Sequence, residues 1–249
     1  MADTRIKNAQ EIEDIKISGQ MLGKVLELVG KNVAPGITPV ELATIARKEV
    51  KALGGIPTFL GMYGFPDVIC ISVNDEIVHG IPKKNEIREG DIVSYDFGVT
   101  YNGMITDAAR STIAGTGTPQ ATRLLKGTLE SLNAGIDVLK DGVRVGDISN
   151  AVEKVLNKYG FGIVRELVGH GVGHELHEDP NIPNYGPAGQ GPILKAGMTI
   201  AIEPMTTLGS YNISTDSDGW TIRTEDGSLA AHFEDTILIT EDSYEILTR

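Results

Sequence analysis

The chain has 249 residues, 41% of them hydrophobic, and 22 lysines and arginines against 34 aspartates and glutamates give a formal net charge of −12. This length can bury the core of one large domain, and no linker-like or low-complexity segment interrupts it, so we predict a single domain over residues 1–249. The negative charge disfavours a nucleic-acid substrate, because a phosphate backbone would be repelled at long range.

Cysteine content and the N-terminal residues bear on the compartment. The single cysteine, Cys70, cannot form an internal disulfide, so the fold does not depend on an oxidising environment. Residues 1–10 carry charges and lack the apolar segment of a secretory signal, and no apolar run is long enough to span a membrane. We therefore expect a soluble cytoplasmic protein without a membrane partner.

Capping residues and hydrophobic periodicity predict the elements. Asn8 with Glu11, and Thr38 with Glu41, have the spacing of capping boxes, and Thr118 is followed by a first-turn proline. Apolar runs bounded by turns indicate strands joined in an antiparallel manner. In chain order we predict helices at 8–29 and 38–54, strands at 68–73, 92–99 and 104–113, helices at 118–140 and 147–159, and strands at 199–202 and 233–239.

The two halves of the sequence resemble each other. Residues 35–37 align with residues 141–143, and residues 90–96 align with residues 197–203. An internal duplication of residues 8–113 and 118–240 would explain this, whereas chance similarity of amphipathic helices is the alternative. A duplication would make Asp96 and Glu203 equivalent and predicts a pseudo-symmetric α+β fold with one acid from each half in a shared cleft.

A hairpin is expected to bring two carboxylates together. Asn102-Gly103 is a strong two-residue turn signal between the strand that contains Asp96 and the strand that contains Asp107. This turn pairs Asp96 with Ala109 and makes Asp107 its diagonal neighbour on the same face. Two such carboxylates repel each other unless a cation is present; the alternative is that one of them lies in a turn or makes a surface hydrogen bond.

Two glutamates and one histidine extend this set. Glu203 follows an apolar strand and Glu234 precedes one, and acids there are rarely buried without a partner. A salt bridge for each is the alternative. His170 lies in the most histidine-rich segment, where Gly171 and Gly173 oppose a helix and exclude a helical zinc motif.

Ligand chemistry indicates the kind of metal. Oxygen-rich ligands without clustered thiolates suit Mn²⁺, Fe²⁺ or Co²⁺ at least as well as Zn²⁺. Four carboxylates around one divalent ion would leave surplus negative charge, whereas two ions come closer to balance. We therefore predict two divalent metal ions per chain.

Five candidate ligands occur in the order of the metal ligands of the type I methionine aminopeptidases, which are pita-bread metallopeptidases. They are Asp96, Asp107, His170, Glu203 and Glu234. Residues 79–82, 170–173 and 202–204 also match, and the resemblance covers nearly the whole chain. It implies a curved antiparallel sheet with helices on its outer face and a dinuclear metal site in the central cleft of a catalytic domain.

The resemblance also implies a mechanism. Asp96 binds one ion, His170 and Glu203 bind the other, and Asp107 and Glu234 bridge them. A metal-bridging water acts as the nucleophile, and Glu203 acts as the general base. The reaction is removal of the initiator methionine from peptides and nascent proteins during protein maturation, with a preference for a small second residue.

Further residues are implied to contact the substrate. His79 and His177 resemble the outer histidines that contact the scissile amide. Six residues resemble the lining of the slot for the methionine side chain, although plain core packing is the alternative for each. They are Phe59, Met62, Phe65, Cys70, Leu176 and Trp220.

Three positions depart from the common family pattern. His174 replaces a basic residue, Leu176 an aromatic residue and His232 a glutamine, which puts contacts at the rim and the shape of the pocket in doubt. Transient ribosome contact follows only from the family role, and a monomer is expected.

Two other functions remain open. A proline-specific aminopeptidase or dipeptidase shares the ligands but usually carries a large N-terminal domain, whereas Asn8 already opens the first helix here. A non-catalytic binding module on this fold usually lacks ligands, whereas all five are present.

Overall fold

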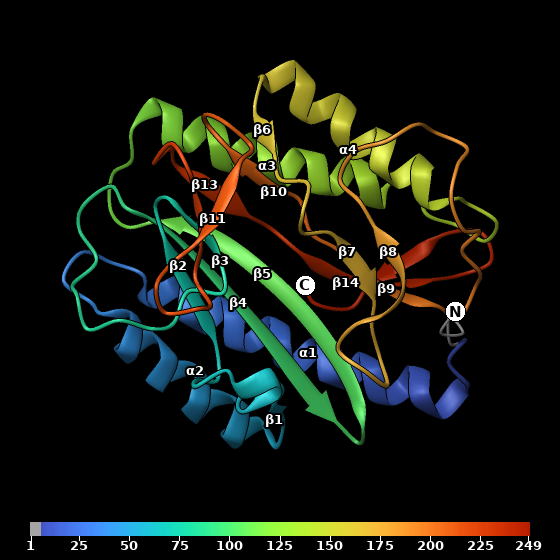
Figure 1. Ribbon diagram of the computed structural model, residues 1–249. Coiled ribbons are helices and arrows are strands. Elements are labelled where there is room, and N and C mark those ends of the chain that lie inside the picture. Colours follow the sequence, from blue (N-terminus) through green and yellow to red (C-terminus); the bar gives the residue numbers. More distant parts are fainter. Residues whose placement is uncertain (1–5) are drawn as a thin grey trace.

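The computed structural model describes residues 6–249 (Figure 1). The expectation about residues 1–10 falls partly on residues 1–5, which lie outside the described residues. Between residues 6 and 249, no helix has both the length and the apolar character needed to cross a bilayer.

Three of the four helices begin directly after the capping residues that the sequence analysis named. Asn8 accepts hydrogen bonds from the backbone N–H groups of Gln10 and Glu11 at 2.9 and 3.1 Å, and Thr38 accepts one from Glu41 at 3.2 Å. The left-handed Gly54 ends the second helix, as expected. The helices are α1 (Ala9–Asn32), α2 (Pro39–Leu53), α3 (Pro119–Ile136) and α4 (Val145–Tyr159).

Three helix boundaries differ from the prediction. The first helix, α1, extends to Asn32 rather than ending at Val29. α3 ends at Ile136 rather than near Lys140. The backbone N–H of Leu139 donates to the carbonyl of Ile136, three residues earlier, and this bond closes a turn instead of continuing the helix. α4 begins before Asp147, because this residue is in the first turn, where its carboxylate accepts the N–H of Arg144 at 3.0 Å.

All strand pairings within residues 6–249 are antiparallel, as predicted. All strands in residues 6–249 that the sequence did not predict are short, with two to five residues, and such strands carry little periodicity. The 3₁₀ turn η1 (Met62–Gly64) is also present. The strands are β1 (Ile56–Pro57), β2 (Cys70–Val73), β3 (Glu76–Val78), β4 (Ile92–Tyr101), β5 (Met104–Ile113), β6 (Gly162–Ile163), β7 (Gly169–Gly171), β8 (Glu178–Ile182), β9 (Thr199–Ile202), β10 (Met205–Thr207), β11 (Ile213–Thr215), β12 (Ile222–Thr224), β13 (Ala230–His232), β14 (Asp235–Ile239) and β15 (Tyr244–Ile246).

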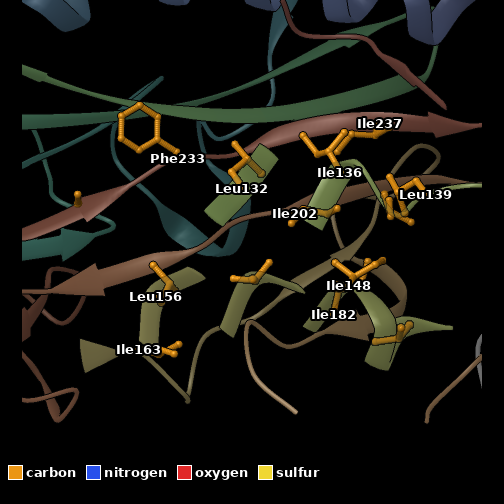
Figure 2. Packing of buried hydrophobic residues seen from close by; sticks show 14 of the residues in the cluster. Leu132, Ile136, Leu139, Ile148, Leu156, Ile163, Ile182, Ile202, Phe233 and Ile237 are labelled. Atoms are coloured by element: carbon orange, nitrogen blue, oxygen red, sulfur yellow. The ribbon is translucent and has the colours of Figure 1, made fainter. Parts of the chain in front are cut away.

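Two helix pairs cover two groups of strands. Apolar residues of α1 and α2 pack on the sheet that contains β2, β4 and β5. A second core joins α3 and α4 to β9 and β14, as the contacts around Leu132, Ile148 and Ile202 show (Figure 2). The strands therefore lie between two outer helix layers (Figure 1).

Strand β5 and the start of β14 join the two groups of strands. Ala109 and Glu234 exchange two backbone hydrogen bonds, at 2.9 and 3.3 Å. The Thr236 hydroxyl accepts the N–H of Asp107 at 2.9 Å and donates to the carbonyl of Asp107 at 2.7 Å. These contacts fix the backbone of Asp107 relative to that of Glu234.

Candidate metal centre

The expected register of the hairpin is confirmed. Asp96 on β4 pairs with Ala109 on β5, and Asp107 lies opposite Gly98, so the two aspartates are diagonal neighbours. Both side chains line one cavity. The Asn102-Gly103 turn has the left-handed backbone at both central residues, which is the conformation that sets this register.

The other half of the chain supplies three more side chains to the same cavity. His170 lies on β7, Glu203 directly follows β9, and Glu234 directly precedes β14. Sheet pairing aligns them, because His170 pairs with Ala201 and Ile202 pairs with Asp235. The structure therefore brings together all five residues that the sequence analysis singled out as metal ligands.

The side-chain atoms of these residues have the spacing of a metal site. Ligand atoms of Asp107, His170 and Glu234 all lie within 4.8 Å of one another. His170 Nε2 is 3.5 Å from Glu203 Oε1. Among residues 8–249, no arginine or lysine forms an ion pair with Asp96 or with any of these carboxylates, so the salt-bridge alternative does not hold for this part of the chain.

A backbone carbonyl orients the ring of His170. His170 Nδ1 lies 2.9 Å from the oxygen of Gly171, which leaves Nε2 with its lone pair toward the carboxylates when Nδ1 carries the proton. A Cβ at Gly169 or Gly171 would lie 2.4 Å from a carbonyl oxygen of β9 or of β8, respectively. The flanking glycines therefore allow β7 to fit between its neighbours.

Burial makes the carboxylates hard to ionise without a cation. Burial and the neighbouring carboxylates raise the pKa of Asp107 and of Glu234 well above their usual values. Burial raises the pKa of Glu203 to about 8, and burial with the nearby Glu203 raises that of Asp96 to about 6. Asp96, Asp107 and Glu234 each keep one buried oxygen without a hydrogen-bond partner in residues 6–249, which fits cation binding.

His232 also lies among these carboxylates, although the sequence analysis expected its departure to affect only rim contacts or pocket shape. The residue is on β13 and is 2% exposed. Its Nε2 is 3.5 Å from Glu203 Oε2 and 3.8 Å from Glu234 Oε2. The other two departures lie elsewhere: His174 contacts Glu11 at 2.9 Å, and Leu176 lines the cavity.

The cavity that these carboxylates line has a volume of about 250 Å³ and is mostly apolar. It is lined by all six residues that the sequence analysis proposed for a side-chain slot, and the Phe65 and Trp220 rings pack edge to face. The sequence analysis did not propose several further residues as part of the lining, because most of them lie on short strands or in loops without a periodic pattern. They are Tyr63, Val78, Leu167, Val168, Met205 and His232.

Two neutral histidines, His79 and His177, line this cavity together with the carboxylates. Burial lowers the pKa of His79 to about 4 and also lowers that of His177. The rings of His170 and His177 meet edge to face, with 4.5 Å between their centroids. His79 has a φ of 58°, which is uncommon outside glycine and is often found at functional sites.

A scan against protein-family models matches residues 13–241 to metallopeptidase family M24. The chain belongs to this family of metallopeptidases. The chain is 46% identical over 243 residues to a methionine aminopeptidase of Clostridium perfringens, and the match covers 98% of both chains. A crystal structure of the methionine aminopeptidase from Thermotoga maritima matches with a TM-score of 0.97 and 45% identity, covering 99% of this chain and 100% of that one.

Identity at this level over nearly the full length of both chains places the chain with the methionine aminopeptidases, as the resemblance implied, and it is an aminopeptidase and a hydrolase. A prolidase from Pyrococcus furiosus matches with a TM-score of 0.79 and 24% identity, covering 99% of this chain but 66% of that one, and shares the fold alone. The expected pita-bread fold is thus confirmed.

Proposed function

We propose that this enzyme removes the N-terminal methionine from peptides and nascent proteins in the cytoplasm, using two divalent cations held by Asp96, Asp107, His170, Glu203 and Glu234. The observation that carries the proposal is the buried cluster of carboxylates and His170 Nε2, which lines a mostly apolar cavity. Mn²⁺, Fe²⁺, Co²⁺ and Zn²⁺ all suit such oxygen and nitrogen ligands.

Bound cations would supply a water that is nucleophilic near neutral pH and would stabilise the negative charge on the carbonyl oxygen. Glu203 then takes the proton of the attacking water on a carboxylate oxygen and returns it to the leaving amine. His79 and His177 are neutral at pH 7 because burial lowers their pKa, so each can donate a ring N–H to the substrate amide without carrying a charge.

The slot accounts for selection of methionine. A thioether side chain is flexible and polarizable, and it packs favourably against aromatic rings and sulfur. Phe59, Phe65 and Trp220 supply rings, while Met62 and Cys70 supply sulfur. Asp96 pairs with Cys70 of the slot, and in this proposal its carboxylate lies close to the free amine of the substrate.

Peptide hydrolysis by reconstituted protein tests this function. Metal-depleted protein is given Met-Ala-Ser and Ala-Pro-Ser, with Mn²⁺, Fe²⁺, Co²⁺ or Zn²⁺ restored in turn, and released amino acids are separated by chromatography. We expect methionine from the first peptide and nothing from the second. Release of alanine from Ala-Pro-Ser alone would instead identify a proline-specific enzyme, and inactivity with every metal would indicate a binding module.

A small second residue should be preferred. A series Met-Xaa-Ser with Xaa from glycine and alanine to leucine and phenylalanine measures this preference directly as kcat/KM. A flat series would contradict this part of the proposal while leaving methionine release intact.

A further inference from the structure

The backbone of His232 is held in place independently of its side chain. The Ser111 hydroxyl accepts the N–H of His232 at 3.0 Å and donates to its carbonyl at 2.8 Å. On the other side, His232 pairs with Met205 of β10. Strands β5 and β10 therefore fix the point from which the imidazole of His232 extends.

The imidazole points at two carboxylates without completing a hydrogen bond. Nε2 is buried and has no hydrogen-bond partner in residues 6–249. Its nearest acidic neighbours are Glu203 Oε2 at 3.5 Å and Glu234 Oε2 at 3.8 Å, and ligand atoms of all three residues lie within 4.8 Å of one another. Buried polar atoms normally have a partner, so the absence of one for this nitrogen needs an explanation, and a bound cation is such an explanation.

These distances suit ligands of one cation. Transition metals lie about 2.0–2.2 Å from nitrogen and oxygen ligands, so neighbouring ligand atoms around one ion are roughly 3–4 Å apart. Glu203 has a ring nitrogen near each of its oxygens, with His170 Nε2 3.5 Å from Oε1 and His232 Nε2 3.5 Å from Oε2. The spacing on the His232 side therefore matches the spacing on the His170 side.

We propose that His232 Nε2 is a direct ligand of a divalent cation that it shares with Glu203 and Glu234, so that the centre holds two imidazoles rather than one. The inference rests on the metal centre proposed above. A neutral imidazole adds a ligand without adding charge, so the four carboxylates still balance two divalent cations. A second nitrogen also favours transition metals over Mg²⁺ and Ca²⁺.

Proton NMR of the Co²⁺-loaded full-length protein tests the proposal. The ring N–H proton of each coordinated histidine gives its own strongly shifted, exchangeable signal. We expect two such signals in the wild type and one in His232→Gln. His170→Gln should lose the other signal, which assigns that signal to His170. His174→Gln is the matched control and should keep both signals, because this histidine contacts Glu11 outside the cluster.

Affinity for Co²⁺, measured by competition with a chelator, gives a second reading. Loss of a residue that hydrogen-bonds a metal ligand lowers metal affinity by about 10–100-fold. Loss of a direct ligand in His232→Gln should lower the affinity for Co²⁺ by at least this factor. A single imidazole signal in the wild type, or two in His232→Gln, would overturn the assignment of His232. The wild-type spectrum decides even if the variant fails to fold. Failure of the wild type to bind Co²⁺ would overturn the proposed metal centre itself.

Discussion

Glu203 lies between two imidazole nitrogens, each 3.5 Å from one of its oxygens. Burial raises its pKa to about 8, so the metal-free carboxyl is largely protonated at pH 7. A cation favours the ionised form and must displace that proton. The free energy needed to ionise this buried group therefore lowers the apparent affinity for the metal.

Metal uptake should consequently release protons. Between pH 6 and 8 the affinity for Co²⁺ should rise, because less free energy is needed to ionise Glu203 as the pH approaches 8. Calorimetric titration in buffers of different ionisation enthalpy measures the number of protons released. Equal heats in all buffers at pH 7 would contradict this account of the carboxylate cluster.

Substitution of Glu203 should affect chemistry more than folding. In Glu203→Gln the group that accepts the proton is gone, and general acid–base catalysis typically contributes about 10²–10⁴-fold, so kcat for Met-Ala-Ser should fall by roughly that factor. The exposed Glu166→Gln is the matched control and should keep wild-type kcat. Activity is compared at saturating metal, with metal content measured for both variants. Near-normal kcat in Glu203→Gln would exclude the role of general base.

At the scale of single residues, the sequence predicts which acidic side chains lie together. The grouping of Asp96 with Asp107 follows from the turn alone, since a two-residue hairpin sets the register. The position of His232 could not be predicted, because β13 has three residues and no periodic pattern. The direction of its side chain depends on pairing with Met205 and on the hydroxyl of Ser111, which lies far away in the sequence.

At the scale of secondary-structure elements, the N-terminal cap of α2 should contribute measurably to stability. Thr38 caps this helix at a half-buried position: its hydroxyl accepts the N–H of Glu41 at 3.2 Å and donates to the Glu41 carboxylate at 2.8 Å, and truncation removes both bonds. Thr38→Ala should lower the free energy of unfolding by about 1 kcal/mol. Denaturant unfolding measures the loss, and Thr44→Ala, on the exposed face of the same helix, is the control expected to change stability less. Equal effects would contradict the capping role.

Strands were predicted less completely than helices. β4 and β5 have ten residues each and a clear apolar pattern, so both were expected. β7 carries His170 but reads Gly-His-Gly, and its strand conformation depends on fitting between β8 and β9. Such short strands are held by their neighbours rather than by their own residue preferences.

On the scale of the whole molecule, the acids of the metal centre lie where two separately packed groups of strands meet. The helix pairs α1 with α2 and α3 with α4 cover these groups, which is compatible with an internal duplication, although the duplication stays a prediction. The centre requires both groups, because Asp96 and Asp107 come from one and His170, Glu203 and Glu234 from the other.

Cation binding should therefore stabilise the entire fold. Without metal, stability should fall as the pH rises from 6.5 toward 8, because Glu203 has a pKa of about 8 in the folded chain and near 4.5 when unfolded. At a free metal concentration of 100 Kd, binding adds about 2.7 kcal/mol, which corresponds to a rise in Tm of roughly 5–10 °C. Thermal melts with and without Co²⁺ measure this gain, and at one fixed Co²⁺ concentration it should be larger at pH 8 than at pH 6.5, because the Kd falls as less free energy is needed to ionise Glu203. A gain that shrinks with pH would contradict it.

The backbone contacts between β5 and β14 have a consequence for ion size. Asp107 and Glu234 cannot move apart without breaking the Thr236 bonds and the exchange between Ala109 and Glu234. Ca²⁺ prefers oxygen distances of about 2.3–2.6 Å and more ligands, so it would need a wider site. We expect a large excess of Ca²⁺ neither to raise the Tm nor to displace bound Co²⁺ in its visible absorption spectrum. A rigid frame of main-chain bonds would then make this protein selective by ionic radius.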